Sequence, residues 1–143
     1  MSKKINFQFL ISYLGLIPYV LTFLDKYYFL IVEEDDLLNF ITYYTLIIIV
    51  FIGSINWNLK NNPPTHIVIY GFLPSLFAVI IIILSLLNIN VLIIFILIIL
   101  LLLTQLFFDY IILFANETNK KAFYSLRLPL TALITIFLLL ISL

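Results

Sequence analysis

The chain has 143 residues, of which 65% are hydrophobic and 10% are charged, and its formal net charge is zero. Soluble domains contain about 45–50% apolar and about 25% charged residues, and a small soluble fold cannot bury so much apolar surface. The absence of cysteine excludes disulfides and thiolate chemistry, and no basic tract suits nucleic acid. The composition therefore predicts an all-α, polytopic membrane protein that forms a single domain over residues 1–143.

Five segments are long and apolar enough to cross a membrane, which takes roughly 20 helical residues. These segments are residues 7–24, 37–56, 67–87, 91–114 and 126–143. The first segment follows Lys3 and Lys4 but lacks a signal-peptidase pattern at its far end, so we expect a retained anchor.

The third and fourth segments are separated only by Asn88-Ile89-Asn90. One continuous helix over residues 67–114 would be about 72 Å long, more than twice the hydrocarbon thickness of about 30 Å. The chain must therefore turn back here. Asparagine suits such a turn because it tolerates the left-handed backbone conformation.

The positive charges predict that the N-terminus faces the cytoplasm and the C-terminus faces the outside. The chain has seven Lys and Arg residues, and in this orientation only Lys26 lies outside. The residues on the cytoplasmic side are Lys3, Lys4, Lys60, Lys120, Lys121 and Arg127. The acidic run at residues 33–36 also falls outside, although acidic residues carry little weight in this rule.

Small and weakly polar residues recur every three or four positions in each segment, and in a membrane such residues mark the faces where helices pack. They are Gln8, Ser12, Gly15, Tyr19 and Thr22 in the first segment, Thr42, Thr45, Gly53 and Asn56 in the second, Gly71, Ser75, Ala78 and Ser85 in the third, Gln105 and Asp109 in the fourth, and Arg127, Thr131 and Thr135 in the fifth. Pro18 and Pro74 lie inside two of the segments. Each removes a helix hydrogen bond, so we expect each to bend its helix.

Asp109 is an acidic residue embedded in an apolar run, near the predicted inner end of the fourth segment. Arg127 begins the fifth segment on the same side, and antiparallel neighbours would bring the two side chains within reach. We therefore predict an Asp109–Arg127 pair. Five further residues are expected at the same depth: Gln105, Asn56, Trp57, Tyr70 and Tyr124.

This inner-face polar cluster has two interpretations. In the first, the ion pair fixes helix register, and the tryptophan and tyrosines anchor the helices at the membrane interface. In the second, the cluster forms a polar pocket for a small ligand, a lipid headgroup or a proton relay, since ionisable groups within a membrane often mark a functional site.

No nucleophile–base constellation, glycine-rich phosphate loop or His/Glu metal motif occurs in the sequence. His66 is the single histidine, and one imidazole without neighbouring carboxylates makes a poor metal site. We therefore expect a protein that is not an enzyme and that holds no cofactor and no metal.

Five short motifs occur in order along the chain. They are Gly15-Leu16-Ile17-Pro18, Ile52-Gly53-Ser54-Ile55-Asn56-Trp57, Tyr70-Gly71-Phe72-Leu73-Pro74-Ser75-Leu76, Asp109 and Tyr124-Ser125-Leu126-Arg127-Leu128-Pro129-Leu130-Thr131. Together they resemble the transmembrane protein 69-like family, small multi-pass domains of bacteria and mitochondria whose function is unassigned. The resemblance spans nearly the whole chain and implies a fold and a topology but no activity.

The chain departs from that family's pattern mainly in the second motif. Ser54 and Asn58 stand where the family tends to have glycine, and Asn56 stands where it tends to have a basic or imidazole residue. If that basic side chain serves a proton or a ligand, this chain lacks it. A rival five-helix family, the tryptophan-rich sensory and translocator proteins, binds porphyrins and sterols with many tryptophans, whereas this chain has only Trp57.

We interpret the chain as a five-helix bundle of the bacterial cytoplasmic (inner) membrane, with a non-catalytic structural or accessory role. Its expected partners are the lipid bilayer and either other membrane subunits or a second copy of the chain, with no nucleic acid. The alternative is a small-ligand or lipid binding or transport protein with a polar pocket at the inner face. An enzyme of lipid or quinone chemistry would need more acids and bases than the sequence offers there.

Overall fold

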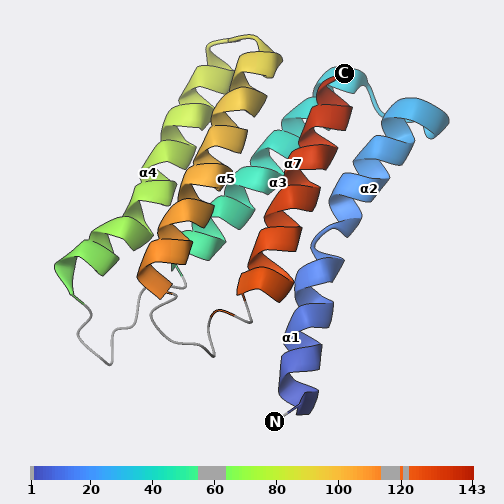
Figure 1. Ribbon diagram of the computed structural model, residues 1–143. Helices are drawn as coiled ribbons and strands as arrows, with labels where there is room; N and C mark the ends of the chain where they lie inside the picture. The colour runs from blue at the N-terminus through green and yellow to red at the C-terminus, as the bar shows by residue number, and fades with distance from the viewer. Residues whose placement is uncertain (1, 55–63, 114–119, 121–122) are drawn as a thin grey trace. The chain divides into compact units, whose positions relative to one another are not determined.

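The computed structural model describes residues 2–54, 64–113, 120 and 123–143 (Figure 1). All regular elements in these ranges are helical, and five helices are long and apolar enough to cross a membrane. These spans are Phe9–Phe29, Glu34–Ser54, Thr65–Leu86, Val91–Ile111 and Phe123–Ser142. The predicted all-α class and the five spans are confirmed, while the orientation of the two termini stays a prediction.

The outward faces of these helices are strongly apolar. In the most apolar 18-residue window of each span, at most 39% of the residues are buried. Ile47 and Phe51 on one helix are 66% and 65% exposed, and Leu86 on the next is 68% exposed. Water is a poor solvent for so much apolar surface, whereas the hydrocarbon of a bilayer is a good one. The exposed faces are therefore compatible with a membrane protein.

The chain divides into two compact units. Unit 1 contains residues Met1–Ile41 and Leu113–Leu143, and unit 2 contains Thr42–Ile112. The border falls within helix α3 (Glu34–Ser54), whose first turns belong to unit 1 and whose remainder belongs to unit 2. The expected single domain over the whole chain stays a prediction.

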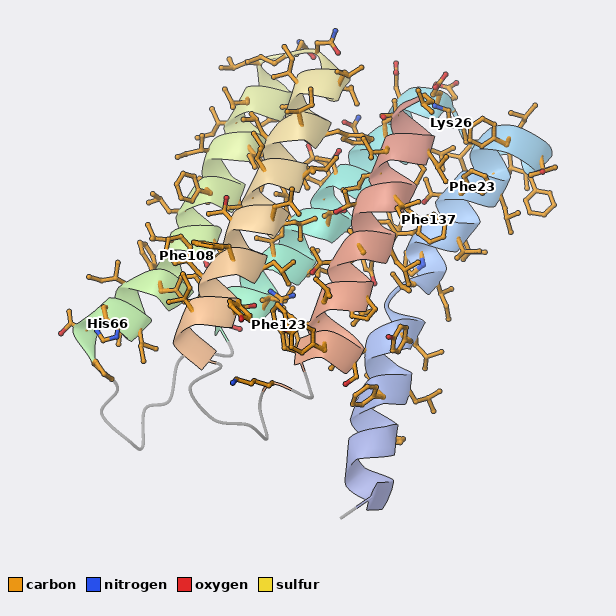
Figure 2. The ribbon with its side chains drawn as sticks, in the orientation of Figure 1. Phe23, Lys26, His66, Phe108, Phe123 and Phe137 are labelled. Carbon is orange, nitrogen blue, oxygen red and sulfur yellow. The ribbon has the colours of Figure 1, made fainter. Side chains whose placement is uncertain are left out.

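Unit 1 is built around the packing of α2 (Ile17–Leu24) against α7 (Leu128–Ser142). Figure 2 shows Phe23 and Phe137 between these two helices, and their ring centroids are 6.3 Å apart. A five-residue π-helical turn, η2 (Phe123–Arg127), precedes α7. The hydroxyl of Tyr13 on α1 (Ser2–Leu14) donates to the Ser125 carbonyl of η2 at 3.1 Å.

The sequence predicted that Pro18 bends a continuous helix. In the structure, Pro18 instead lies at the start of a new helix. Helix α1 ends at Leu14, and Pro18 lies in the first turn of α2, where its missing N–H leaves no helical bond unmade. The Leu16 amide donates to the Tyr13 carbonyl at 3.0 Å, a tightened turn that separates the two helices. The first predicted segment is therefore two helices, followed by the π-helical turn η1 (Asp25–Phe29).

Pro74 does lie inside a helix, α4 (Thr65–Leu86). In Figure 1 the N-terminal turns of α4 are angled away from the rest of the helix, as expected when a proline removes one hydrogen bond and its ring crowds the preceding turn. The position of Pro74 inside the helix agrees with the expectation, and the bend at this residue stays a prediction.

The turn between α4 and α5 (Val91–Leu113) is built from its two asparagines. Asn88 has φ of 56°, and its amide and that of Ile89 donate to Ser85 and Leu84 carbonyls in the last turn of α4. This left-handed cap satisfies carbonyls that would otherwise lack partners. Asn90 then begins α5, because its side-chain oxygen accepts the Leu92 amide at 2.9 Å. Helices α4 and α5 consequently run antiparallel and side by side (Figure 1), and the predicted turn is confirmed.

The predicted interior faces are buried in part: Ser12, Gly15, Ser75, Ser85, Arg127 and Thr135 are half-buried, and the side chains of Gln8 and Asn56 lie outside the described ones. Tyr19, Thr45 and Ala78 are 0%, 0% and 4% exposed, respectively. Helix α3 begins earlier than predicted, at Glu34 instead of residue 37. Its first turn contains three acidic residues, which the positive end of the helix dipole stabilises.

Helices α3 and α4 approach each other closely at Gly53. A β-carbon at this position would lie 2.8 Å from Pro74 Cγ and 2.9 Å from the Gly71 carbonyl oxygen. Neither neighbour is a flexible side-chain end, so an added methyl group would have to move the α4 backbone. The small residue at position 53 is therefore required by the packing of unit 2.

We predict that Gly53→Ala lowers stability although alanine favours helix by about 1 kcal/mol over glycine. Overpacking of this kind costs about 1–3 kcal/mol and so outweighs the gain. Thermal unfolding in detergent would measure the change, and Ser54→Ala at the neighbouring exposed position is the matched control. A Gly53→Ala midpoint equal to or above that of the control would show that the two helices can separate freely.

Candidate functional site

Three polar side chains of unit 2 lie together in the interior, and we call them the unit 2 polar cluster: Tyr70 on α4, and Gln105 and Asp109 on α5. Their exposed fractions are 7%, 2% and 2%. Gln105 and Asp109 are four residues apart, which places both on the same face of α5.

The Tyr70 hydroxyl connects α4 to α5 through two acceptors. It donates to Asp109 Oδ1 at 2.6 Å and lies 3.0 Å from the Gln105 carbonyl oxygen. A phenol has one hydrogen, so the two oxygens share it, and the carboxylate takes the shorter and stronger bond. The Tyr70 ring also packs 5.7 Å from the ring of Phe108, centroid to centroid.

Gln105 extends the cluster to the third helix of unit 2. Its Nε2 donates to the Ile49 carbonyl of α3 at 3.0 Å. Ile49 lies one turn before Gly53, where α3 contacts α4. Gln105 Oε1 is buried and has no hydrogen-bond partner among the described residues. The cluster therefore links α3, α4 and α5 and retains one acceptor.

The structure brings together three of the seven residues expected at this depth, namely Tyr70, Gln105 and Asp109. Arg127 and Tyr124 belong to η2 in unit 1, where the ring of Tyr124 packs edge-on against Phe123. The Asp109–Arg127 pair stays a prediction. Asn56 and Trp57 lie outside the described residues.

The unit 2 polar cluster contains one carboxyl group, one phenol and one carboxamide. In the described ranges no three His, Cys, Asp or Glu side chains gather as metal ligands would. His66 is exposed in the first turn of α4 (Figure 2). Chemically, the cluster can join helices and can accept one further hydrogen bond.

A second polar group, which sequence reasoning missed, closes the end of α7 in unit 1. Lys26 Nζ donates to the Ile141 carbonyl at 2.5 Å and lies 2.9 Å from Glu34 Oε1, and the Tyr27 hydroxyl donates to the Leu140 carbonyl at 2.7 Å. The last carbonyls of a helix lack intrahelical partners and carry the negative end of its dipole. Figure 2 shows Lys26 beside this end of α7.

Lys26 is also the one basic residue that the predicted topology leaves outside. Its contacts give the physical reason for a cation at this position, because it caps α7 and pairs with α3. The sequence signal for this contact was that Lys26 departs from the positive-inside distribution and lies alone among acidic and aromatic residues.

Asp25 shapes the connection between α2 and α3. Its carboxylate accepts the amides of Ile31 at 3.3 Å and Val32 at 3.0 Å. Its carbonyl accepts the Leu30 amide at 2.8 Å, and Leu30 adopts the left-handed conformation with φ of 51°. One aspartate thus satisfies the amides of a turn that ends η1.

The fold is that of an all-helical protein with five helices long and apolar enough to cross a membrane. Its two described polar groups form hydrogen bonds that join one helical element to another. The sequence model of one family, described as "Protein of unknown function (DUF3429)", matches residues 6–143. The chain belongs to this family. No curated protein and no solved structure matches the chain.

We predict that Tyr70→Phe destabilises unit 2, because it removes the donor to a buried carboxyl group. Hydrogen bonds between membrane helices average about 0.6 kcal/mol and reach about 1.7 kcal/mol, and we expect a loss within this range. Unfolding by detergent titration would measure the loss, with Tyr28→Phe at a 72% exposed tyrosine as control.

The double variant Tyr70→Phe with Asp109→Leu removes both partners and should lose less than the two single losses added together. Strict additivity would contradict the proposed coupling between Tyr70 and Asp109.

Proposed function

We propose that the chain is a non-catalytic structural or accessory component of the bacterial cytoplasmic membrane, with its N-terminus inside and its C-terminus outside. The observation that carries the proposal is that the unit 2 polar cluster bonds to its own helices. Tyr70 bonds to Asp109, and Gln105 bonds to the backbone of α3. Groups used in this way stabilise packing and are not presented to a substrate.

The apolar outer faces supply the second support. A helix face such as that of Ile47 and Phe51 can contact either lipid or the helix of another protein. We propose that the partners are lipid and either further membrane subunits or a second copy of this chain. The five motifs in register support membership of the transmembrane protein 69-like group, which is part of the same proposal.

The accessory role predicts an assembly larger than one chain. Purification from membranes in a mild detergent, followed by native electrophoresis and mass spectrometry, should yield a complex of defined stoichiometry with a second subunit or a second copy. Cross-linking in intact membranes before extraction is the control for dissociation by detergent. A single protomer in both experiments would contradict the proposal.

The proposed Asp109–Arg127 pair predicts rescue by exchange. Asp109→Arg and Arg127→Asp should each lower protein level or stability, since each places like charges together, and the double exchange should recover most of the loss. Immunoblots of membrane fractions and thermal unfolding would measure both. Normal levels of the exchanged protein without recovery of its cellular phenotype would argue that the pair has a role other than packing.

A small-ligand binding protein is the second candidate, and one observation favours it. Gln105 Oε1 is a buried acceptor without a partner in the described part of the chain. Buried polar atoms in folded proteins nearly always have a donor, so a donor from a bound molecule or a buried water would satisfy it. Density for an organic molecule at this atom, in a structure determined in lipid, would favour ligand binding over the accessory role.

A further inference from the structure

Unit 1 contains a cleft of about 550 Å³ at the connection between α2 and α3. This volume is within the range of about 300–1,000 Å³ that is usual for small-molecule sites. All residues that line it lie between positions 21 and 40, in α2, η1, the following turn and the first two turns of α3. One continuous stretch of unit 1 therefore forms the whole cleft.

The lining combines an apolar wall with two carboxylates. Six of the lining residues are apolar: Leu21, Phe29, Ile31, Val32, Leu37 and Phe40. The others are Thr22, Asp25 and Asp36, so no basic side chain lines the cleft. Lys26 is adjacent in sequence, but its ammonium group bonds to the Ile141 carbonyl and to Glu34.

The two carboxylates are held differently. Asp25 is 9% exposed and fixed by the Ile31 and Val32 amides, which use two of the roughly four acceptor positions of a carboxylate. Asp36 is exposed in the first turn of α3, and neither aspartate forms an ion pair with any described residue. A cation in the cleft would therefore meet two negative groups with acceptor positions to spare.

The helix dipole does not distinguish Asp36 from its neighbour Asp35. The dipole favours acidic residues anywhere in the first turn of α3, and Asp35 satisfies that preference equally well. Only Asp36 of this pair lines the cleft. The neighbouring residues therefore separate the effect of the dipole from the effect of the cleft.

Exposed apolar side chains lie at the cleft and beside it. Phe29 and Ile31 are 59% and 80% exposed, and Leu30 between them is 74% exposed. Apolar side chains at the end of a membrane helix stabilise it by burial at the level of the lipid headgroups. In a chain that spans a membrane as proposed, lipid headgroups and the upper parts of acyl chains would therefore lie beside the cleft.

We propose that the cleft binds a phospholipid with a primary ammonium headgroup, such as phosphatidylethanolamine. The ammonium group donates hydrogen bonds to Asp36 and Asp25, and one acyl chain follows the wall of Leu21 and Phe40. A choline headgroup carries no N–H to donate, and an anionic headgroup is repelled by the two carboxylates. The inference rests on the proposed membrane location but not on the accessory role, and it concerns a different unit from the unit 2 polar cluster.

The test is a lipid titration of the purified full chain, followed by native mass spectrometry. Phosphatidylethanolamine, phosphatidylcholine and phosphatidylglycerol with identical acyl chains are added separately, and the lipid-bound fraction is measured. Phosphatidylethanolamine should bind about tenfold more tightly than the other two, the factor expected from one hydrogen bond to a charged group.

Asp36→Asn should remove this preference, whereas the matched control Asp35→Asn should keep it. Because a charge change in the first turn of α3 also alters helix stability, a second variant, Leu21→Trp, fills the apolar wall and leaves both carboxylates in place. It should weaken binding of phosphatidylethanolamine without changing the circular dichroism spectrum.

Three results would overturn the proposal. The first is equal binding of the three lipids to the unaltered chain. The second is an equal loss in Asp35→Asn and Asp36→Asn, which would indicate attraction by general surface charge. The third is unchanged binding in a folded Leu21→Trp variant, which would place the lipid outside the cleft.

Discussion

The main physical constraint on unit 2 is a carboxyl group within an apolar helix, which needs a hydrogen-bond donor. The Tyr70 hydroxyl supplies a donor to Asp109. An unpartnered charge at the centre of a membrane helix costs about 2.5–3.5 kcal/mol on insertion scales, and the cost is smaller near the helix end, where Asp109 is predicted to lie. The hairpin supplies the donor at the correct depth. Tyr70 lies 18 residues before Asn88 and Asp109 lies 19 residues after Asn90, which corresponds to about 27 Å and about 29 Å of helix. The asparagine turn therefore brings the two side chains level.

The packing of α3 against its neighbours depends on a close approach of the helix backbones. Leucine and lipid are about equally apolar, so apolar area alone gives membrane helices little reason to associate. Gly53 lets the α3 backbone meet Pro74 and the Gly71 carbonyl, which increases dispersion contacts. The Gln105 carboxamide then bonds to Ile49, one turn away. The close contact at Gly53 and the hydrogen bond at Ile49 lie on adjacent turns of α3. Each contact therefore helps to hold the helix position that the other requires.

The sequence predicted what depends on local chemistry. The apolar lengths predicted five spans, and two asparagines predicted the reversal. The depth argument selected seven residues, of which Tyr70, Gln105 and Asp109 lie together in the structure. The sequence did not predict the interruption before Pro18, because a proline can either bend a helix or begin one, and the preceding turn decides which.

Contacts that join distant positions were also beyond sequence reasoning. Lys26 caps a carbonyl 115 residues further along the chain. Gln105 bonds to a backbone oxygen at Ile49, and a backbone acceptor carries no signature in the sequence. Such partners are identified only when helix packing is known.

Three aspartates of this chain show how the environment of a carboxyl group decides its use. Asp109 accepts a phenol hydrogen between two helices, and Asp25 accepts two backbone amides of a turn. Both are buried, and each is bonded to the element it stabilises. Asp36 is exposed at the wall of an apolar cleft, and its side chain forms no hydrogen bond to a described residue. A cation that carries a hydrocarbon chain can contact both a carboxylate and the apolar surface beside it. Asp36 is therefore the acidic group best suited to recognise a molecule from outside the chain.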